Sequence, residues 1–495
     1  MALVALVVGA VLIYYIGVLV YRLYFSPIAK FPGPKLAAAT LWYEFYYDVV
    51  QMGQYTFKIQ QLHKEYGPIV RISPFELHID DPEYYEVLYS RSSPRDKYEF
   101  FTQQFGNPLS GFGTVPHGLH RLRRQPLNEF FSKASISKLE PVLTTMTERL
   151  CSRIDQYKGT GEPLSMRHVY MCLTTDVITL YSMNRSWNHL DSHDFSPLWC
   201  KTIKATAEAG PLLKQFPWLF PIINSMPDWM LGALNPGMLL LLTFQRDIAR
   251  QIQNIMDNPE EEGELPRTIF HALWKSDLPA EEKSLKRLWQ EGQIVVGAGA
   301  DTTASVLSVT TFHILDNPDK LQKLKEELET AFPDRYAPVT LAVAEKLPYL
   351  RVAPNETLQF HEWTIPPGVS FLTKPYSDLF ETTYLPPIEL QTPVGMTSVM
   401  MHHNEDIFPD SFSFIPERWV DKSLQKYLVP FTKGSRQCIG INLARAELCL
   451  VLATVFRRYD MELFETVRER DVDLAHEMFL PQPSQQSKGV RVMFS

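Results

Sequence analysis

The chain has 495 residues, a net charge of -8 and a pI near 5.9. Nucleic-acid binding needs a clustered excess of basic residues, so this acidic balance excludes nucleic acid as a partner. Five cysteines are widely spaced and form no Cys-x-x-Cys pair, which is typical of a reduced, cytosol-facing protein. No Gly/Ser-rich spacer divides the chain, so we expect one large globular body.

The N-terminal segment differs sharply in composition from the rest of the chain. Ala2 to Tyr21 is uncharged and rich in Leu, Val, Ile and Ala, and its length matches the ~20 residues that cross a bilayer as a helix. A cleaved signal peptide is the alternative, but no basic residue precedes the apolar run. Arg22 and Lys30 follow it, which predicts a single-pass anchor at residues 1–25 with the remainder in the cytosol.

The body after the anchor carries mainly helical patterns with short extended pieces. Ile69 to Ile79 alternates β-branched and polar residues, and a long helical pattern runs from Leu285 to Leu315. Between Gly210 and Gly237 the sequence is apolar and interrupted by prolines. This segment is either a loop of short helices that reaches the bilayer or guards a pocket, or an ordinary buried connection.

A cysteine near the C-terminus lies in a ten-residue segment that contains Phe431, Gly434, Arg436, Cys438 and Gly440. A helical pattern follows directly, and the N–H groups at a helix start favour the thiolate, the form that binds a metal. The glycines allow tight turns and the close approach of a flat cofactor, while the arginine offers a fork suited to a carboxylate. Taken singly, an inert cysteine and a surface arginine are the ordinary alternatives.

Together, the order Phe-x-x-Gly-x-Arg-x-Cys-x-Gly resembles the haem-binding loop of the cytochrome P450 superfamily. The resemblance implies that Cys438 is the axial thiolate ligand of a haem b iron and that Arg436 pairs with a haem propionate. It also implies a mainly α fold, a helical prism with a small β-rich lobe, over residues 26–495.

The long helical pattern contains Gly297, Gly299, Asp301 and Thr302. Glycines inside a helix normally cost stability, so we expect them to let the helix run close to a cofactor and bend locally. By resemblance to the family's central helix, Asp301 and Thr302 relay protons to dioxygen, a general-acid role worth about 10²–10⁴-fold in rate. A kinked core helix is the alternative.

A basic segment upstream supplies candidates for the haem propionates. The family usually places a tryptophan four residues before a propionate-binding arginine, and by this resemblance His117 stands in the tryptophan position and Arg121 in the arginine position. Arg123 and Arg124 are interpreted as solvated side chains.

The chain departs from the family after Leu350, where a Glu-x-x-Arg helix is expected. Glu356 has the right spacing, but Gln359 stands in place of the arginine and Pro354 would break the helix. We therefore interpret residues 351–368 as the extended segment that the family places later, with the Glu-x-x-Arg turn missing.

This interpretation predicts that Arg418 and Glu417, in the segment that normally completes a salt-bridged triad with that turn, lack ion-pair partners. An unpaired buried charge costs several kcal/mol, so haem retention would be weakened. Residues 369–391 match nothing in the family pattern, which resumes at Thr392. They are a suspected insertion, either a translated intron or a genuine loop.

By resemblance, the chain hydroxylates or epoxidises a lipophilic small molecule with dioxygen and with electrons from NADPH through a membrane-bound NADPH-cytochrome reductase. Segments 29–37, 41–48 and 401–403 are similar to the fungal secondary-metabolism branch that includes trichodiene oxygenase, which favours a terpenoid or another small apolar metabolite. Membrane lipid around the anchor is a further expected partner, and the expected location is the endoplasmic reticulum membrane with the catalytic domain in the cytosol. Lys426, Lys433 and Arg445 flank the cysteine loop and form a candidate docking face for an acidic partner.

Three alternatives stay open. The first is a haem-thiolate isomerase or dehydratase, against which the acid–alcohol pair weighs. The second is an inactive, membrane-tethered remnant that cannot retain haem. The third is a zinc or redox cysteine protein, for which the sequence offers no second ligand at suitable spacing.

Overall fold

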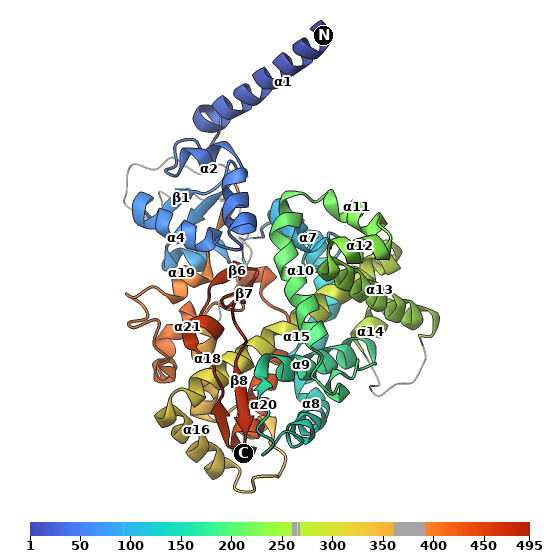
Figure 1. The fold of residues 1–495 in the computed structure, drawn as a ribbon, viewed down its shortest axis with the longest axis vertical. Helices are drawn as coiled ribbons and strands as arrows, with labels where there is room; N and C mark the ends of the chain where they lie inside the picture. Colours follow the sequence, from blue (N-terminus) through green and yellow to red (C-terminus); the bar gives the residue numbers. More distant parts are fainter. Residues whose placement is uncertain (93, 260–264, 266–267, 361–391) are drawn as a thin grey trace.

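The N-terminal helix stands apart from the rest of the molecule. The computed structural model describes all residues except 93, 260–264, 266–267 and 361–391. Helix α1, Ala2–Val20, continues into the π-helical turn η1, Tyr21–Phe25, and neither buries a residue in the body. The 24-residue span has a mean hydropathy of 2.8 and projects as a rod that ends at the N-terminus (Figure 1). Its exposure fits a membrane anchor, because only lipid would cover so apolar a surface.

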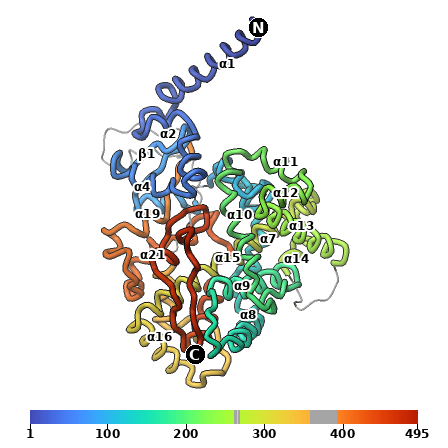
Figure 2. The backbone as a smooth tube through the Cα atoms, in the orientation of Figure 1, coloured from blue at the N-terminus to red at the C-terminus, as the bar shows by residue number. Residues whose placement is uncertain are grey.

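The body is mainly helical, as predicted (Figure 2). Its longer helices are α4 Tyr55–Tyr66, α7 His117–Phe130, α8 Lys133–Ile154, α9 Met166–Met183, α10 Pro197–Gln215, α11 Leu219–Ser225, α12 Asp228–Leu234, α13 Pro236–Asp257, α14 Ile269–Lys275, α15 Leu285–Leu315, α16 Pro318–Ala331, α18 Pro348–Phe360 and α20 Ile441–Arg458. Its short helices are α2 Lys35–Ala39, α3 Trp42–Phe45, α5 Tyr85–Leu88, α6 Glu99–Thr102, α17 Leu341–Ala344, α19 Ser398–His402 and α21 Arg468–Asp471.

Short strands form three small sheets. They are β1 Ile69–Arg71, β2 Leu77–Ile79, β3 Leu164–Ser165, β4 Val394–Gly395, β5 Met461–Leu463, β6 His476–Met478, β7 Leu480–Gln482 and β8 Arg491–Phe494. The first sheet has the order β1-β2-β4, the second β3-β8-β5, and β6 and β7 form an antiparallel hairpin. The extended pattern over 69–79 is confirmed, because β1 and β2 pair antiparallel, while β4 pairs parallel with β2.

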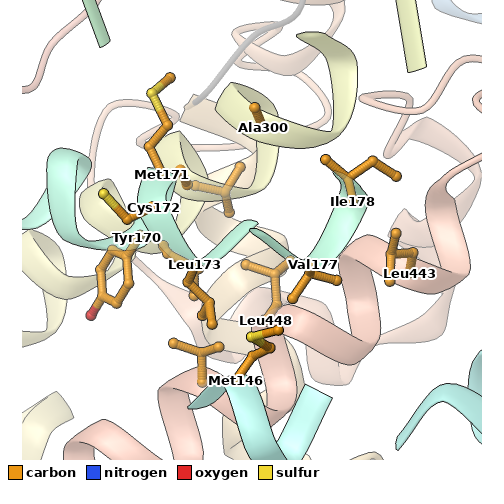
Figure 3. Packing of buried hydrophobic residues seen from close by; sticks show 14 of the residues in the cluster. Met146, Tyr170, Met171, Cys172, Leu173, Val177, Ile178, Ala300, Leu443 and Leu448 are labelled. Carbon is orange, nitrogen blue, oxygen red and sulfur yellow. The ribbon is translucent and has the colours of Figure 1, made fainter. Parts of the chain in front are cut away.

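The core is built around α15, whose bounds are those predicted from the sequence. Helix α9 is buried along almost its whole length and packs on α15. The two helices come so close that a Cβ on Gly299 would lie 2.7 Å from Ile178 Cγ1, and Thr174 Oγ1 donates to the Ala300 carbonyl. Figure 3 shows this packing, with Leu443 and Leu448 of α20 in the same cluster.

The segment between α10 and α13 forms two short helices with exposed apolar side chains. Trp218 is 60% exposed and Trp229 is 77% exposed, and α11 and α12 lie at the end of the body from which α1 projects (Figure 1). Such exposure favours the short-helix loop over an ordinary buried connection for residues 210–237.

The interpretation of residues 351–368 as an extended segment is wrong for its described part, because α18 runs through Phe360. Pro354 lies inside this helix and removes one backbone hydrogen bond, but the helix is held by burial of its inner face. Val352 packs against Phe408 and Trp419, and Thr310 donates to Thr357 Oγ1 across the interface with α15 (2.8 Å). Tertiary packing therefore overrides the proline.

The predicted loss of ion-pair partners is also wrong. Arg418 Nε donates to Glu356 Oε1 (3.1 Å), and Trp419 Nε1 donates to Glu356 Oε2 (2.6 Å). Glu417 pairs with Lys320 and Lys323. Glu356 is thus a buried acidic residue that binds the Pro416–Trp419 segment. The suspected insertion, 369–391, lies outside the described residues.

Candidate functional site

A cavity of about 420 Å³ lies between α15, the cysteine loop and the start of α20. Most of its wall is apolar, so it suits a flat apolar cofactor and a lipophilic ligand. The apolar lining includes Phe105, Phe112, Leu127, Phe131, Ile178, Val295, Val306, Leu443, Leu448 and Phe479.

Cys438 opens into this cavity from the loop that precedes α20. Its backbone N–H donates to the Phe431 carbonyl (2.9 Å), which closes the loop. Gly434 has φ of +75° and lies against the Tyr89 carbonyl, so a side chain at this position would clash with that carbonyl. A Cβ on Gly440 would lie 3.9 Å from the Cys438 Sγ. The glycines therefore shape the loop around the cysteine.

Opposing effects act on the Cys438 thiol. Burial raises its pKa, while the N–H groups of Gly440 and Ile441 and the positive charge of Arg124 lower it. The helix start acts in the direction expected from the sequence, but burial outweighs it in the protein without a metal. A bound cation would reverse that balance.

Arg436 fits a carboxylate ligand. Its Nη1 and Nη2 donate to the carbonyls of Thr114 and Val115 (2.8 Å each), whereas its buried Nε has no partner in the described part of the chain. Burial lowers the pKa of Arg436 to about 10, so the guanidinium is charged at neutral pH. Lys97 and Arg124 also line the cavity. An orphaned guanidinium donor beside a second arginine, Arg124, matches what haem propionates require.

The predicted pair His117 and Arg121 is not brought to the cavity. The His117 backbone N–H donates to Asp96 Oδ1 (2.7 Å), and its imidazole lies near Ser435. Arg121 is exposed. The pair His120 and Arg124, with the same spacing, lines the cavity instead.

Helix periodicity explains this choice of register. His120, Arg124 and Leu127 lie at spacings of four and three residues, so they share one face of α7, and all three line the cavity. Burial lowers the pKa of His120 to about 2, so its imidazole is neutral. The apolar Leu127 was the available sequence signal for the cavity-facing side.

Arg123 is not solvated, contrary to the interpretation from the sequence. It is buried and donates to both oxygens of Glu282 (2.7 and 2.9 Å) and to Thr114 Oγ1 (2.8 Å). Because Arg436 binds the Thr114 carbonyl, this ion pair also supports the segment that orients Arg436.

The acid and the alcohol of α15 point in different directions. Thr302 lines the cavity, and its Oγ1 donates to the Ala298 carbonyl (2.8 Å). Asp301 is only 1% exposed and accepts from Arg167 Nη2 at both oxygens (2.8 and 2.9 Å). A Cβ on Gly297 would meet no atom within 4 Å. Gly297 therefore widens the cavity, whereas Gly299 serves helix packing.

Glu447 is a cavity residue that the sequence did not single out. It lies on α20, is 3% exposed and forms a hydrogen bond with Thr303 of α15. Burial raises its pKa well above the usual value, which favours the neutral form. Nothing in its local sequence separates it from an ordinary helical glutamate.

The candidate docking face is partly neutralised. Lys426 pairs with Glu83 (3.1 Å) and Lys433 pairs with Glu86, while the Arg445 guanidinium lies over the Phe431 ring. Within the described ranges, no group of three or more His, Cys, Asp or Glu side chains could hold a metal ion. A multi-ligand zinc site therefore finds no support there.

Comparison with known proteins agrees with this geometry. The family model for cytochrome P450 matches residues 33–488. A cytochrome P450 monooxygenase of Ascocoryne sarcoides is 51% identical over 99% of this chain and 98% of its own length. A tryptophan 6-hydroxylase of Fusarium equiseti is 42% identical over 95% and 93%, and an N-acetyltryptophan 6-hydroxylase of Emericella nidulans is 39% identical over 99% and 96%. The chain therefore belongs to the cytochrome P450 family and is an oxidoreductase of the monooxygenase type.

Proposed function

We propose that the chain hydroxylates or epoxidises a lipophilic small molecule of fungal secondary metabolism, with a terpenoid as the leading class. Dioxygen is the oxidant, and NADPH supplies electrons through a membrane-bound NADPH-cytochrome reductase. The observation that carries the proposal is that Cys438, Arg436 and Thr302 line one largely apolar cavity.

The residues of this cavity would have two roles toward haem, to hold its iron and to hold its propionates. Haem, when bound, supplies the iron chemistry that activates dioxygen. Cys438 would hold the iron through its thiolate, and Arg436, with Arg124 and Lys97, would hold the propionates. His120 and Arg124, which line the cavity, would take the role expected for His117 and Arg121.

Proton delivery is proposed for α15. Thr302 Oγ1 bonds a carbonyl of its own helix, so a rotation about χ1 would turn the hydroxyl toward the cavity. Asp301, one residue away, is bound at both oxygens by Arg167, so it would reach the cavity only if that ion pair opened. Their proposed joint role is to hold and move protons at the cavity wall.

An aromatic substrate derived from tryptophan is a second candidate. Two relatives are named as hydroxylases of tryptophan and N-acetyltryptophan. The rings of Phe105, Phe112 and Phe479 line the cavity and lie with centroids 5.0 to 5.6 Å apart, a wall suited to an aromatic ligand.

The proposed location is the endoplasmic reticulum membrane, with the catalytic body in the cytosol. Helix α1 would span the bilayer, and the exposed Trp218 and Trp229 would contact lipid at the interface. Lys426, Lys433 and Arg445 remain the proposed reductase face, although two of them carry acidic partners.

The chain as given lacks residues that a close relative has. The match to the Ascocoryne sarcoides protein runs over 527 positions, more than the 495 residues of this chain. We propose that part of this difference is the missing portion of the Glu-x-x-Arg region, and that residues 369–391 are an insertion. An inactive remnant is the alternative, opposed by the Glu356–Arg418 pair, which keeps two of the three residues of the expected triad.

The absorption spectrum of the reduced, carbon-monoxide-bound protein tests the function. The wild-type chain should show a thiolate-type Soret band, and Cys438→Ser should lose it. Cys449 is a buried cysteine on α20, so Cys449→Ser is the control and should keep the band. A band that appears only after residues 369–391 are removed and the Glu-x-x-Arg turn is restored would identify the remnant. Substrate turnover without NADPH would identify an isomerase or dehydratase.

A further inference from the structure

A second, smaller cavity of about 90 Å³ lies beside the first and is lined by charged groups. Glu44 comes from α3, Asp48 from the π-helical turn η2 (Tyr46–Val50), and Glu76 from the segment before β2. Lys214, near the end of α10, faces them. We call this cavity the acidic chamber.

Acidic groups outnumber basic groups in the acidic chamber. Lys214 Nζ lies 2.5 Å from Glu44 Oε1 and 3.2 Å from Asp48 Oδ2, while Glu76 accepts a hydrogen bond from Ser73 (3.0 Å). Burial raises the pKa of Glu76 to about 8, so this group is protonated at neutral pH. Burial also raises the pKa of Glu44 and Asp48, against the lowering effect of Lys214. Three acidic groups therefore share one ammonium group, and a second cation would favour their charged forms.

Two residues that line the acidic chamber each have a buried polar atom without a partner among the described residues. Glu44, 5% exposed, leaves Oε2 without a donor, and Gln104, also 5% exposed, leaves Nε2 without an acceptor. A buried polar atom without a partner costs about 1–3 kcal/mol, so such atoms usually have a ligand or water. Glu44 Oε2 can accept a hydrogen bond and Gln104 Nε2 can donate one. A ligand that carries both a donor and an acceptor would satisfy the two atoms.

The other polar groups of the chamber wall are accounted for. Burial lowers the pKa of His78 well below its usual value, so the imidazole is neutral. Glu477 accepts from Thr56 Oγ1 (3.0 Å) and from the Phe479 N–H (2.6 Å). Glu44 is therefore the carboxylate best placed to receive an additional donor.

The acidic chamber and the large cavity share one wall, the Phe479 ring. Phe479 lies at the turn of the β6–β7 hairpin with φ of +69°, a left-handed conformation that is strained for a side chain of this size. Its ring contacts Phe101, which lines the acidic chamber, and Phe105, which lines the large cavity. A ligand that passes this ring would therefore occupy both spaces.

We propose that the acidic chamber binds the primary ammonium group of a ligand whose apolar body extends past Phe479 into the large cavity. This inference rests on the proposed function and specifies its substrates as lipophilic amines. The volume of about 90 Å³ corresponds to about three water molecules, which is enough for an ammonium group and an adjacent oxygen. Glu44 Oε2 accepts from the ammonium, and Gln104 Nε2 donates to the oxygen.

The test uses a series of 1-(ω-aminoalkyl)imidazoles with four to twelve carbons and their methyl-terminated analogues. The imidazole end ligates haem iron and shifts the Soret band, while the ammonium end reaches the acidic chamber at a matching chain length. Binding to the full chain is followed in parallel by this shift and by titration calorimetry, which needs no haem. At the best length the amine should bind about tenfold more tightly than its analogue.

Glu44→Gln should reduce this preference to within about twofold, because the substitution removes the carboxylate but keeps its shape. Glu208→Gln is the matched control, because Glu208 pairs with Lys204 on the surface of α10, the helix that carries Lys214. This variant should keep the preference. Phe479→Gly is a second variant. It removes the ring and relieves the positive φ, so amines of shorter chain should also gain the preference.

The two proposals fail separately. If calorimetry shows no amine preference at any length, or if Glu44→Gln keeps it, water fills the acidic chamber and the inference is overturned. If calorimetry shows the preference without any Soret shift, the inference stands and haem binding by this chain fails.

Discussion

The cysteine loop, residues 431–440, and helix α18 both carry motif residues, but the structure overturns the sequence interpretation only for α18. The motif residues of the loop lie within ten consecutive residues, including Gly434 with its left-handed φ and Cys438, whose N–H donates to the Phe431 carbonyl. Glu356 of α18 instead depends on Arg418 and Trp419, about sixty residues away. A motif within one short segment can be recognised from the sequence even when its surroundings differ. A contact between distant segments cannot be recognised when one motif residue is replaced, as by Gln359.

The largest loss of stability is expected for Glu356→Ala, which leaves Arg418 buried without its ionic partner. Removing one partner of a buried ion pair costs about 3–5 kcal/mol of stability. Urea unfolding at pH 8 measures the loss. Glu417→Ala, in the same segment but in a half-exposed pair, should cost less than about 1 kcal/mol. Equal small losses would mean that α18 contributes no more than a surface pair.

Glu356 should also make the stability of the protein depend on pH. Burial raises the pKa of Glu356 from 4.5 to about 7, against the lowering effects of Arg418, the Ile415 N–H and Trp419. The folded state therefore binds this proton more tightly than the unfolded state. Its contribution to stability is fully present below pH 4.5 and is lost as the pH rises through about 7.

Glu356→Gln isolates this contribution, because other titrating groups cancel in the difference between the two proteins. Relative to the variant, the wild-type chain should lose up to about 3 kcal/mol between pH 4.5 and pH 7. Thermal unfolding across that range measures the difference. A difference that does not vary with pH would place the Glu356 pKa near its ordinary value.

On the side of the loop, Gly434→Ala tests the local determinants. A Cβ there would meet the Tyr89 carbonyl in a left-handed conformation, so the substitution should cost at least about 2 kcal/mol. Gly118→Ala, on α7 with no atom within 4 Å of the added Cβ, should be neutral or stabilising by up to about 1 kcal/mol. Effects of the same sign and size would show that the loop tolerates a side chain.

Much of the fold followed from local patterns. The bounds of α15, the extended pieces β1 and β2 and the apolar span at the N-terminus are confirmed. Pro354 misled because a general rule about proline gave no weight to the buried face of α18. The opposite directions of Asp301 and Thr302 were also beyond the sequence, since only the neighbouring Arg167 of α9 shows which way the acid turns.

The register of α7 lies between these two cases, because two His-x-x-x-Arg pairs overlap and both fit the spacing. The structure supports His120 and Arg124, which line the cavity, over His117 and Arg121, which do not. Arg124→Ala should therefore release haem about tenfold faster than the wild-type chain, the loss expected for one charge-assisted hydrogen bond.

Arg121→Ala is the matched control, because it removes the same side chain three residues away from an exposed position. It should change the release rate by less than about twofold. Transfer of haem to an excess of apomyoglobin, followed by the decay of the Soret band, measures both rates. If Arg121→Ala accelerates release and Arg124→Ala does not, α7 meets the cofactor in the register first inferred from the sequence, and the helix must turn by about 60° from its position here when haem binds.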